Sequence, residues 1–345
     1  MRKLHKLLAK EYIFYLITVL SALTITVFIF DLLEFADELI NLPFIYVLKF
    51  IALRIPFFLS YTMFYSIILA SVLSVLALSN RFELLVLFSS QVSNKRITLF
   101  LLLLISATTI IAFLNDTFLS PLCYRESMIL VGKAKPFSEI ELKDIAIKKN
   151  NGFIFIDQIE EGGKVAKSVT EITLDDKKKI KLITIIPMAE KMSDGWHIKN
   201  AYTYNDYGEK FEQREIKTLQ LSDALINLAY KPKMLTLLEI KKLFDFSKNF
   251  NIDTSKYSHH ISKLLAHTIV PIFAFLLFFK ILPITVDDKK RIILALKLVF
   301  FLILYTIIEA NIYNYAIANK LNALYPLAII SVAFLIVVQS VKRQL

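Results

Sequence analysis

Residues 79–96 read SNRFELLVLFSSQVSNKR, and they separate two long apolar segments, 55–78 and 97–118. Each flanking segment is long enough to cross a bilayer as a helix, which takes about 20 residues. A single helix over 55–88 would be about 51 Å long and would exceed a hydrocarbon core of ~30 Å. The chain therefore leaves the lipid after the first segment. We predict a short helix at the membrane surface over about residues 81–91.

The composition indicates that other parts of the chain are also embedded in a membrane. Of the 345 residues, 56% are hydrophobic, and the mean hydropathy is +0.57. Soluble domains rarely carry such an excess of apolar side chains. Transmembrane helices explain it, because six apolar segments approach or exceed the length of a span. These segments are 12–33, 55–78, 97–118, 261–279, 292–315 and 321–338.

The loop charges predict the orientation of these helices. Lysine and arginine gather at both termini and in the loops 80–96 and 280–291, whereas the residues after the first span are acidic. Because basic loops stay in the cytoplasm, both termini are predicted to be cytoplasmic. The net charge of +11 then belongs to these loops and is not a sign of nucleic-acid binding. The segment between the third and fourth spans is predicted to lie outside the cytoplasm.

That external segment has the pattern of an all-β domain. From about residue 138 the sequence is of strand type, and turn signals such as NNG at 150–152 recur at short intervals. Short strands without intervening helices predict an antiparallel sandwich or jelly roll. Its most apolar strand leaves two interpretations open, an interior wide enough for an acyl chain or an ordinary sandwich core. The residues concerned are Phe153, Ile154, Phe155 and Ile156.

The predicted fold is an α-helical membrane protein of six transmembrane helices with an inserted all-β, jelly-roll-like domain. Residues 1–121 hold the first three spans, 122–256 the β domain and 257–345 the last three spans. Thr236 and Glu239 have the spacing of a helix capping box and precede a one-sided apolar pattern. This predicts an amphipathic helix that leads from the β domain back to the membrane.

The chain lacks the motifs of an ATPase, a hydrolase or a metal site. The phosphate-binding pattern G-x-x-x-x-G-K-[ST] does not occur, so any ATP would be hydrolysed by another chain. Cys123 is the single cysteine, which excludes an internal disulfide. His259 and His260 are adjacent, do not share a helix face, and would make a poor chelate. We therefore expect no enzyme activity, no metal site and no cofactor bound by this chain.

The surface segment 82–88 carries one acidic residue among apolar ones. A helix that is apolar all round and has left the membrane needs a protein groove, where its acid can meet a basic group. The alternative is a helix lying flat on lipid, although such helices usually offer lysine or arginine to the headgroups. The residues predicted to contact a partner are Arg81, Phe82, Glu83, Leu84, Leu87 and Phe88.

These features resemble the LptF/LptG family, the permease subunits of the lipopolysaccharide export ABC transporter of Gram-negative bacteria. The resemblance covers the whole chain. Its most specific part is NRFELLVLFSSQVS at 80–93, which is similar to the family's coupling helix, with Glu83 at the acidic position. FADEL at 35–39, NNGFIFIDQI at 150–159 and the segment around Tyr257 also match. The first and last of these are closer to LptG than to LptF.

The resemblance implies a function and a set of partners. Two such permeases would pair and admit lipopolysaccharide laterally, between the first span of one and the fifth span of the other. An LptB-type ATPase dimer, which holds ATP and Mg²⁺, would bind the coupling helix. ATP-driven closure would push the substrate to the jelly-roll domains and onwards to an LptC-type bridge protein. The chain would be a multi-pass protein of the inner membrane with its β domain in the periplasm.

One stretch departs from the family pattern. LptG-type members carry lysines near the outer end of the first span, whereas residues 31–43 here read DLLEFADELINLP and hold no base. The positive charge could come from Lys49 and Arg54, or from a divalent cation that bridges carboxylate and phosphate. Alternatively, the subunit contacts another part of the substrate. The residues predicted to line the cavity or its gate are Glu34, Phe35, Asp37, Lys49, Arg54, Tyr305 and Glu309.

Glu309 is the acidic residue of the fifth predicted span. A carboxylate that faces lipid is costly, so we expect its side chain to turn toward a polar cavity or a partner. The alternative is that Glu309 reaches the outer interface or pairs with Lys320.

Two other functions fit part of the pattern. A membrane scaffold or assembly factor would use the β domain to bind partners without transporting anything. A lipoprotein-releasing or peptide-exporting ABC permease is the other candidate, but such proteins place their large external domain after the first span, and here three spans precede it. A transporter, unlike a scaffold, would copurify with an ATPase that it stimulates.

Overall fold

The structure is a computed structural model. It describes residues 2–89, 93–134, 142–149, 151–160, 164–175, 178–192, 195–198, 200–205, 210–213, 230–247, 254–281, 300, 302–311 and 314–315. The chain divides into a membrane unit, Met1–Tyr124 with Ser258–Leu345, and a β unit, Arg125–Tyr257. The sequence analysis placed its boundaries after residues 121 and 256, and these domain limits remain a prediction.

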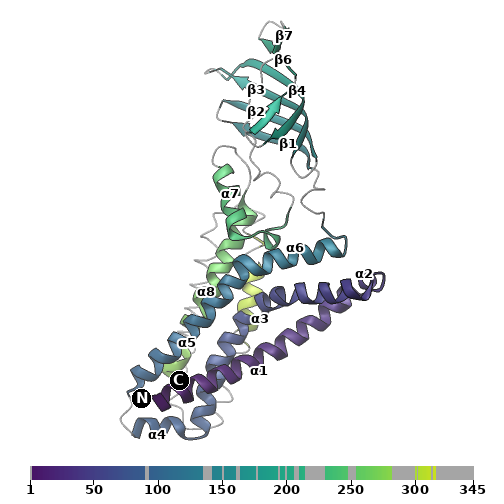
Figure 1. Cartoon of the computed structure of the whole chain (residues 1–345). Helices are drawn as coiled ribbons and strands as arrows, with labels where there is room; N and C mark the ends of the chain where they lie inside the picture. The colour runs from purple at the N-terminus through teal and green to yellow at the C-terminus, as the bar shows by residue number, and fades with distance from the viewer. Residues whose placement is uncertain are drawn as a thin grey trace. The chain divides into compact units, whose positions relative to one another are not determined.

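The membrane unit is built from long apolar helices (Figure 1). Its helices are α1 (Arg2–Glu34), α2 (Ala36–Ile40), α3 (Phe44–Asn80), α4 (Glu83–Ser89), α5 (Asn94–Leu114), most of α8 (Ser255–Ile281) and a helix over Leu302–Asn311. α5 continues through a π-helical turn, η1 (Asn115–Leu119), into α6 (Ser120–Leu130). Helices suit this role because each satisfies its own backbone hydrogen bonds where water is absent.

Four helices in the described residues are long and apolar enough to cross a membrane. They are Leu4–Glu34, Phe44–Asn80, Lys95–Leu130 and Ser255–Leu276, and the first four predicted spans fall on them. The fifth predicted span is described mainly over Leu302–Asn311, and the sixth lies outside the described residues. The chain is thus a helical membrane protein, and the count of six spans remains a prediction.

α3 lies at the centre of the membrane unit and packs against α1, α4 and α5. It is buried over most of its length, with Ile67 and Ile68 fully covered in the apolar core. α1 differs, because it exposes large apolar side chains such as Ile17 and Phe30. Such a surface is typical of a helix that faces lipid or another transmembrane helix.

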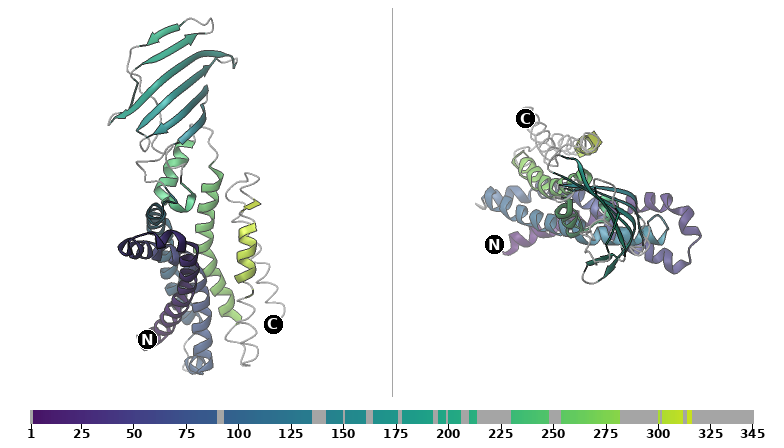
Figure 2. Two further views of the ribbon diagram at one scale, coloured as in Figure 1. Left: turned by 90° about the vertical axis from the view of Figure 1, so that its right-hand side faces the viewer. Right: turned by 90° about the horizontal axis from the view of Figure 1, so that it is seen from above.

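The described strands of the β unit form one antiparallel sheet, which Figure 2 shows as a single curved layer. Its strands are β1 (Leu142–Lys149), β2 (Gly152–Glu160), β3 (Val165–Leu174), β4 (Ile180–Met192), β5 (Gly195–Ile198), β6 (Ala201–Asn205) and β7 (Lys210–Gln213). The order is β1-β2-β3-β4-β6-β7, with β5 paired to β4. The unit also holds a 3-10 turn, η4 (Pro232–Met234), and α7 (Leu237–Ser247).

This strand order bears on the predicted domain type. The antiparallel all-β prediction is confirmed, and the described strands form a meander in which successive strands are mostly neighbours. A jelly roll needs strands that cross between two sheets. Because residues 214–229 lie outside the described part, the jelly roll remains a prediction.

The four apolar residues of β2 lie on two opposite faces of the sheet. Ile154 and Ile156 are 0% and 1% exposed and belong to a core that includes Trp196. Phe153 and Phe155 stack with ring centroids 6.2 Å apart, and Phe155 is 40% exposed. Side chains alternate along a strand, so the two isoleucines build the core while the two phenylalanines lie on the opposite face.

Helix α7 begins with the predicted capping box, which is confirmed. The Thr236 amide donates to Glu239 Oε2 at 2.7 Å, and the Glu239 amide donates to Thr236 Oγ1 at 3.3 Å. Arg125 Nη1 donates to Glu239 Oε1 at 2.9 Å. Burial raises the pKa of Glu239, but the hydrogen bonds from Thr236 and Arg125 together outweigh it and lower the pKa. Ile240 is buried on the apolar side of α7, as expected of an amphipathic helix.

Gly152 begins β2 at a close approach of two backbones. Its φ is +154°, and a Cβ atom added there would overlap the carbonyl oxygen of Ile172 on β3. Gly152→Ala should therefore force β2 and β3 apart at this end. We expect a loss of more than about 1 kcal/mol in the stability of the β unit. Thermal unfolding and limited proteolysis of the purified chain measure the loss.

Gly132→Ala is the matched control for this prediction. Gly132 has a φ of +68°, but no atom of the described residues lies within 4 Å of an added Cβ atom. The substitution therefore adds only the strain of a left-handed backbone, about 1 kcal/mol. Equal losses in the two variants would contradict the prediction, because the overlap at Gly152 would then have no cost of its own.

Candidate functional site

The turn between α3 and α4 positions the predicted coupling helix. Arg81 closes α3, and its amide donates to the carbonyl of Ala77 at 3.1 Å. Phe82 follows with a φ of +56°, which is uncommon for a residue other than glycine. The turn ends α3 at Asn80, as the length argument predicted, and α4 begins at Glu83.

α4 has an inner and an outer side. Leu84, 3% exposed, and Leu87 pack against the apolar core of the membrane unit. Phe82 and Val86, four residues apart, are 63% and 60% exposed. Glu83 keeps one carboxylate oxygen buried without a hydrogen-bond partner among the described residues. The turn and the start of α4 therefore expose two apolar side chains, Phe82 and Val86, next to the partly buried acid Glu83.

Arg81 forms an ion pair with Glu11 of α1. Its Nη1 donates to Glu11 Oε1 at 2.8 Å, and the Arg81 side chain is 55% exposed while that of Glu11 is 8% exposed. Sequence reasoning predicted a partner contact for Arg81 and missed Glu11. The available signal was an acid between the basic N-terminus and the first apolar segment. The side chain of Phe88, another predicted contact, lies outside the described part.

A buried ion pair joins the far ends of α1 and α3. Arg54 Nε donates to Asp31 Oδ2 at 2.8 Å, and Arg54 Nη2 pairs with Asp31 Oδ1. The two side chains are 2% and 9% exposed. Aromatic rings surround the guanidinium, which cation–π attraction favours. Their centroids lie 4.6–5.7 Å from Cζ, and they belong to Phe35, Phe50, Phe57, Phe58 and Tyr124.

The predicted cavity residues around this ion pair fall into two groups, buried and exposed. Arg54 and Phe35 are internal to the fold, and the charge of Arg54 is already neutralised. Glu34, Asp37 and Lys49 are exposed. Of the two bases considered for the substrate, only Lys49 therefore has its side chain at the surface.

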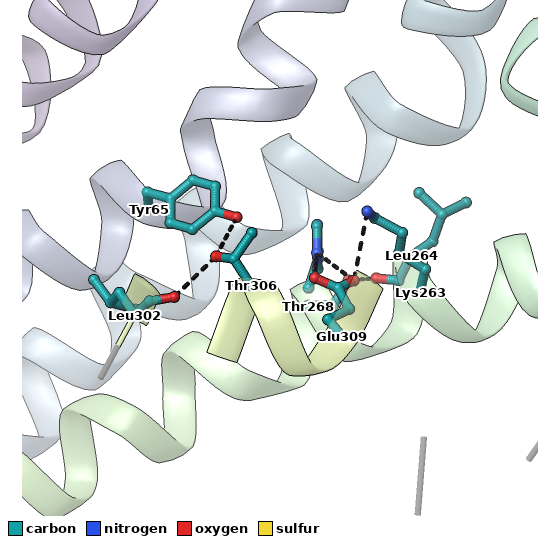
Figure 3. A network of polar contacts seen from close by, with 8 residues as sticks. Tyr65, Lys263, Leu264, Thr268, Leu302, Thr306 and Glu309 are labelled. Atoms are coloured by element: carbon teal, nitrogen blue, oxygen red, sulfur yellow. Dashed lines mark hydrogen bonds and ion pairs between the residues drawn. The ribbon is translucent and has the colours of Figure 1, made fainter. Parts of the chain in front are cut away.

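A second buried ion pair joins α8 to the helix Leu302–Asn311 (Figure 3). Glu309 is 4% exposed. His267 Nε2 lies 3.0 and 3.3 Å from its two carboxylate oxygens, and Lys263 Nζ lies 3.5 Å from Oε1. Pairing with α8 was not among the sequence-based alternatives. Lys320, the partner considered there, lies outside the described residues.

Neutral contacts connect this second ion pair to α3. Tyr65 Oη lies 2.9 Å from Thr306 Oγ1 (Figure 3). The ring of Phe64 stacks on His267 and on Tyr305, with centroids 4.4 and 5.5 Å apart. Tyr305, a predicted gate residue, is 5% exposed. The two predicted gate residues of this helix thus lie where it meets α3 and α8.

The described side chains support charge pairing and apolar docking. Among them, no three His, Cys, Asp or Glu residues lie close enough together to hold a metal ion. The ion pairs of the membrane unit described above instead join residues that are 23 to 70 positions apart in the sequence.

Comparison with known proteins identifies the family of this chain. No individual characterised protein gives a significant sequence match. The profile of one family, described as lipopolysaccharide export system permease LptF/LptG, matches residues 6–341. The match extends through both the membrane unit and the β unit. Because nearly the whole sequence is covered, the chain belongs to the lipopolysaccharide export system permease LptF/LptG family.

Proposed function

We propose that the chain is the non-catalytic permease subunit of an ATP-driven transporter for lipopolysaccharide or lipooligosaccharide. It would extract this lipid from the outer leaflet of the inner membrane for transport to the outer membrane. Family membership supports the proposal, as do the long apolar helices and the separate β unit. The alternative, a scaffold without transport activity, gives no role to an apolar helix presented beyond the end of a span.

The outer side of α4 is the observation that carries the proposal. Val86 on α4 and Phe82 in the turn before it are exposed apolar side chains, and Glu83 is the first residue of α4. A groove on an ATPase would cover the apolar pair and supply a basic partner for the acid. The partner would be an LptB-type ATPase dimer that holds ATP and Mg²⁺, while this chain binds no cofactor.

The remaining partners follow from the same proposal. They are a second LptF/LptG-type permease and an LptC-type periplasmic bridge protein. The exposed apolar side of α1 supports contact with a neighbouring transmembrane helix. We assign the chain to the LptG type on FADEL at 35–39 and on the segment around Tyr257. Both termini would be cytoplasmic, and the β unit would lie in the periplasm of a Gram-negative bacterium.

The β unit would pass acyl chains over its exposed apolar face. Phe153 and Phe155 lie on that face, whereas Ile154 and Ile156 are occupied in the core. β1 would pair with a neighbouring sheet, because in the described sheet it is hydrogen-bonded to β2 alone. An edge strand of this kind presents unpaired backbone groups to another chain.

The substrate phosphate would meet exposed groups near the outer end of the first span. Lys49 is an exposed base, whereas Arg54 is engaged by Asp31. The exposed Glu34 and Asp37 support the other source of charge, a divalent cation that bridges carboxylate and phosphate.

Replacing Glu83 by alanine tests the docking of the ATPase. The variant should recover less ATPase on copurification and export less lipopolysaccharide. A carboxylate that is buried with a basic partner leaves that partner uncompensated when it is removed. We expect at least a roughly tenfold weaker association, which corresponds to about 1.4 kcal/mol.

Asp157→Asn is the control, because it removes one exposed carboxylate from β2 and leaves α4 unchanged. It should recover the ATPase as the unmodified chain does. Normal ATPase recovery and export by Glu83→Ala would contradict the proposed role of Glu83. If the unmodified chain stimulates no ATPase at all, the scaffold function gains support instead.

A further inference from the structure

Glu11 is a buried acid at the start of the first span. Its side chain is 8% exposed, and its neighbours Leu8 and Tyr12 are fully covered in the apolar core. A carboxylate in such surroundings needs a partner to remain charged. The partner is Arg81, whose Nη1 lies 2.8 Å from Glu11 Oε1.

Arg81 connects two parts of the membrane unit that the sequence separates. Its backbone belongs to the α3–α4 turn, directly before the left-handed Phe82 and two residues before Glu83. Its guanidinium is held by Glu11 on α1. A displacement of the turn would therefore act on α1 through this ion pair.

α1 is also attached to α3 at its other end. Asp31 pairs with Arg54, and both side chains are buried. The attachment points Glu11 and Asp31 are 20 residues apart (31 − 11), or about 30 Å along a helix. These two ion pairs, together with the packing between them, hold α1 against α3. α1 and α3 therefore form one body, with α4 at one end.

We propose that Glu11 is a positioning residue that couples α4 to α1, so that α1 follows the movement which ATP hydrolysis imposes on α4. The inference rests on the proposed function, in which α4 binds the ATPase. It assigns different roles to two acids near one turn. Glu83 holds the ATPase, whereas Glu11 transmits its movement. Loss of Glu11 should leave the ATPase bound and separate ATP hydrolysis from export.

The test uses the complete complex in proteoliposomes, with a second permease of the family and an LptB-type ATPase. Three quantities are measured, namely the ATPase recovered, the rate of ATP hydrolysis and the lipopolysaccharide released per ATP. Glu11→Gln should preserve the ATPase recovery and the rate of ATP hydrolysis. It should lower the lipopolysaccharide released per ATP about fivefold or more, the size of a typical coupling between two sites. Glu11→Met is the second variant if the Gln variant fails to accumulate, because methionine leaves no unpaired polar group at position 11. It should lower the lipopolysaccharide released per ATP by the same factor.

Two controls alter the same turn of α1. Lys10→Gln removes an exposed charge beside Glu11. Tyr12→Phe removes a hydrogen bond of 2.8 Å to Thr108 on α5, and the Thr108 hydroxyl keeps its bond to the carbonyl of Ile105. Both variants should release lipopolysaccharide per ATP as the unmodified complex does.

A double-mutant cycle then shows whether the effect belongs to the ion pair. Arg81→Gln should also lower release per ATP, and the double variant Glu11→Gln/Arg81→Gln should be no worse than Arg81→Gln alone. Unchanged release per ATP in Glu11→Gln overturns the inference. A parallel loss of ATPase recovery and thermal midpoint also overturns it, because the pair would then act only in folding. Failure of the unmodified complex to bind ATPase would instead refute the proposed function.

Discussion

Arg54→Leu is expected to destabilise the membrane unit strongly. The substitution leaves Asp31, 9% exposed, as an unpaired carboxylate among the aromatic rings that now surround the guanidinium. Removing one partner of a buried ion pair costs about 3–5 kcal/mol, because the other charge stays buried without compensation. The thermal midpoint of the purified chain should fall accordingly. Neither the hydrogen bonds nor the cation–π contacts of Arg54 can be replaced by leucine.

Two further variants isolate the cause. Asp31→Leu/Arg54→Leu removes both charges and should recover most of the lost stability, since apolar replacement of a whole buried pair is often neutral. Lys49→Leu removes an exposed base from the same helix and should leave the midpoint nearly unchanged. An Arg54→Leu midpoint equal to that of Lys49→Leu would contradict the prediction.

The double variant also tests the assignment of the substrate base. If Arg54 serves only Asp31, lipopolysaccharide binding should survive in Asp31→Leu/Arg54→Leu. It should weaken in Lys49→Leu if Lys49 meets the phosphate. If only the double variant lost lipopolysaccharide binding, Arg54 would be the base that meets the substrate phosphate.

Glu309→Gln is expected to weaken the attachment of the helix Leu302–Asn311 to α8. The carboxylate contacts both His267 and Lys263, and glutamine removes its charge with little change in shape. We expect a loss of about 1 kcal/mol or more, because the buried group gives up its charge-assisted contacts with the His267 ring and the partly exposed Lys263. A lower thermal midpoint and faster proteolysis near this helix would measure it.

Asn311→Ala is the matched control in the same helix. Asn311 is exposed, and its amide donates to the carbonyl of Ile307 within the helix. The variant should unfold close to the midpoint of the unmodified chain. The combination Glu309→Gln/His267→Gln should lose less than the sum of its single variants, since the two residues share one interaction. Simple additivity would show that the contact contributes little.

Most secondary-structure elements could be predicted because their signals are local. The prediction that the second span ends before residue 82 required only the length of the apolar segment and the thickness of a bilayer. The capping box of α7 needed only Thr236 and Glu239, which meet within one turn of helix. The alternation along β2 predicted that its isoleucines and phenylalanines lie on opposite faces, but not which pair the core would cover.

The candidate sites were predictable only in part. Glu83 stood out because one acid interrupts an apolar segment that has left the membrane. Glu11 did not, since an acid beside a basic N-terminus resembles any other interfacial charge. Arg54 was considered as a base for the substrate, and the structure instead surrounds it with aromatic side chains from α3, from α6 and from the residue that follows α1.

The sequence by itself determined the kind of element over the long helices and the strands, because the length of an apolar segment and the period of a pattern are properties of a single segment. Only the tertiary structure decided the partners of the charges. Arg54 and Asp31 are 23 residues apart, His267 and Glu309 are 42 apart, and Arg81 and Glu11 are 70 apart. Which of these groups meet depends on how helices cross and rotate against each other, and packing of side chains from distant segments sets that geometry.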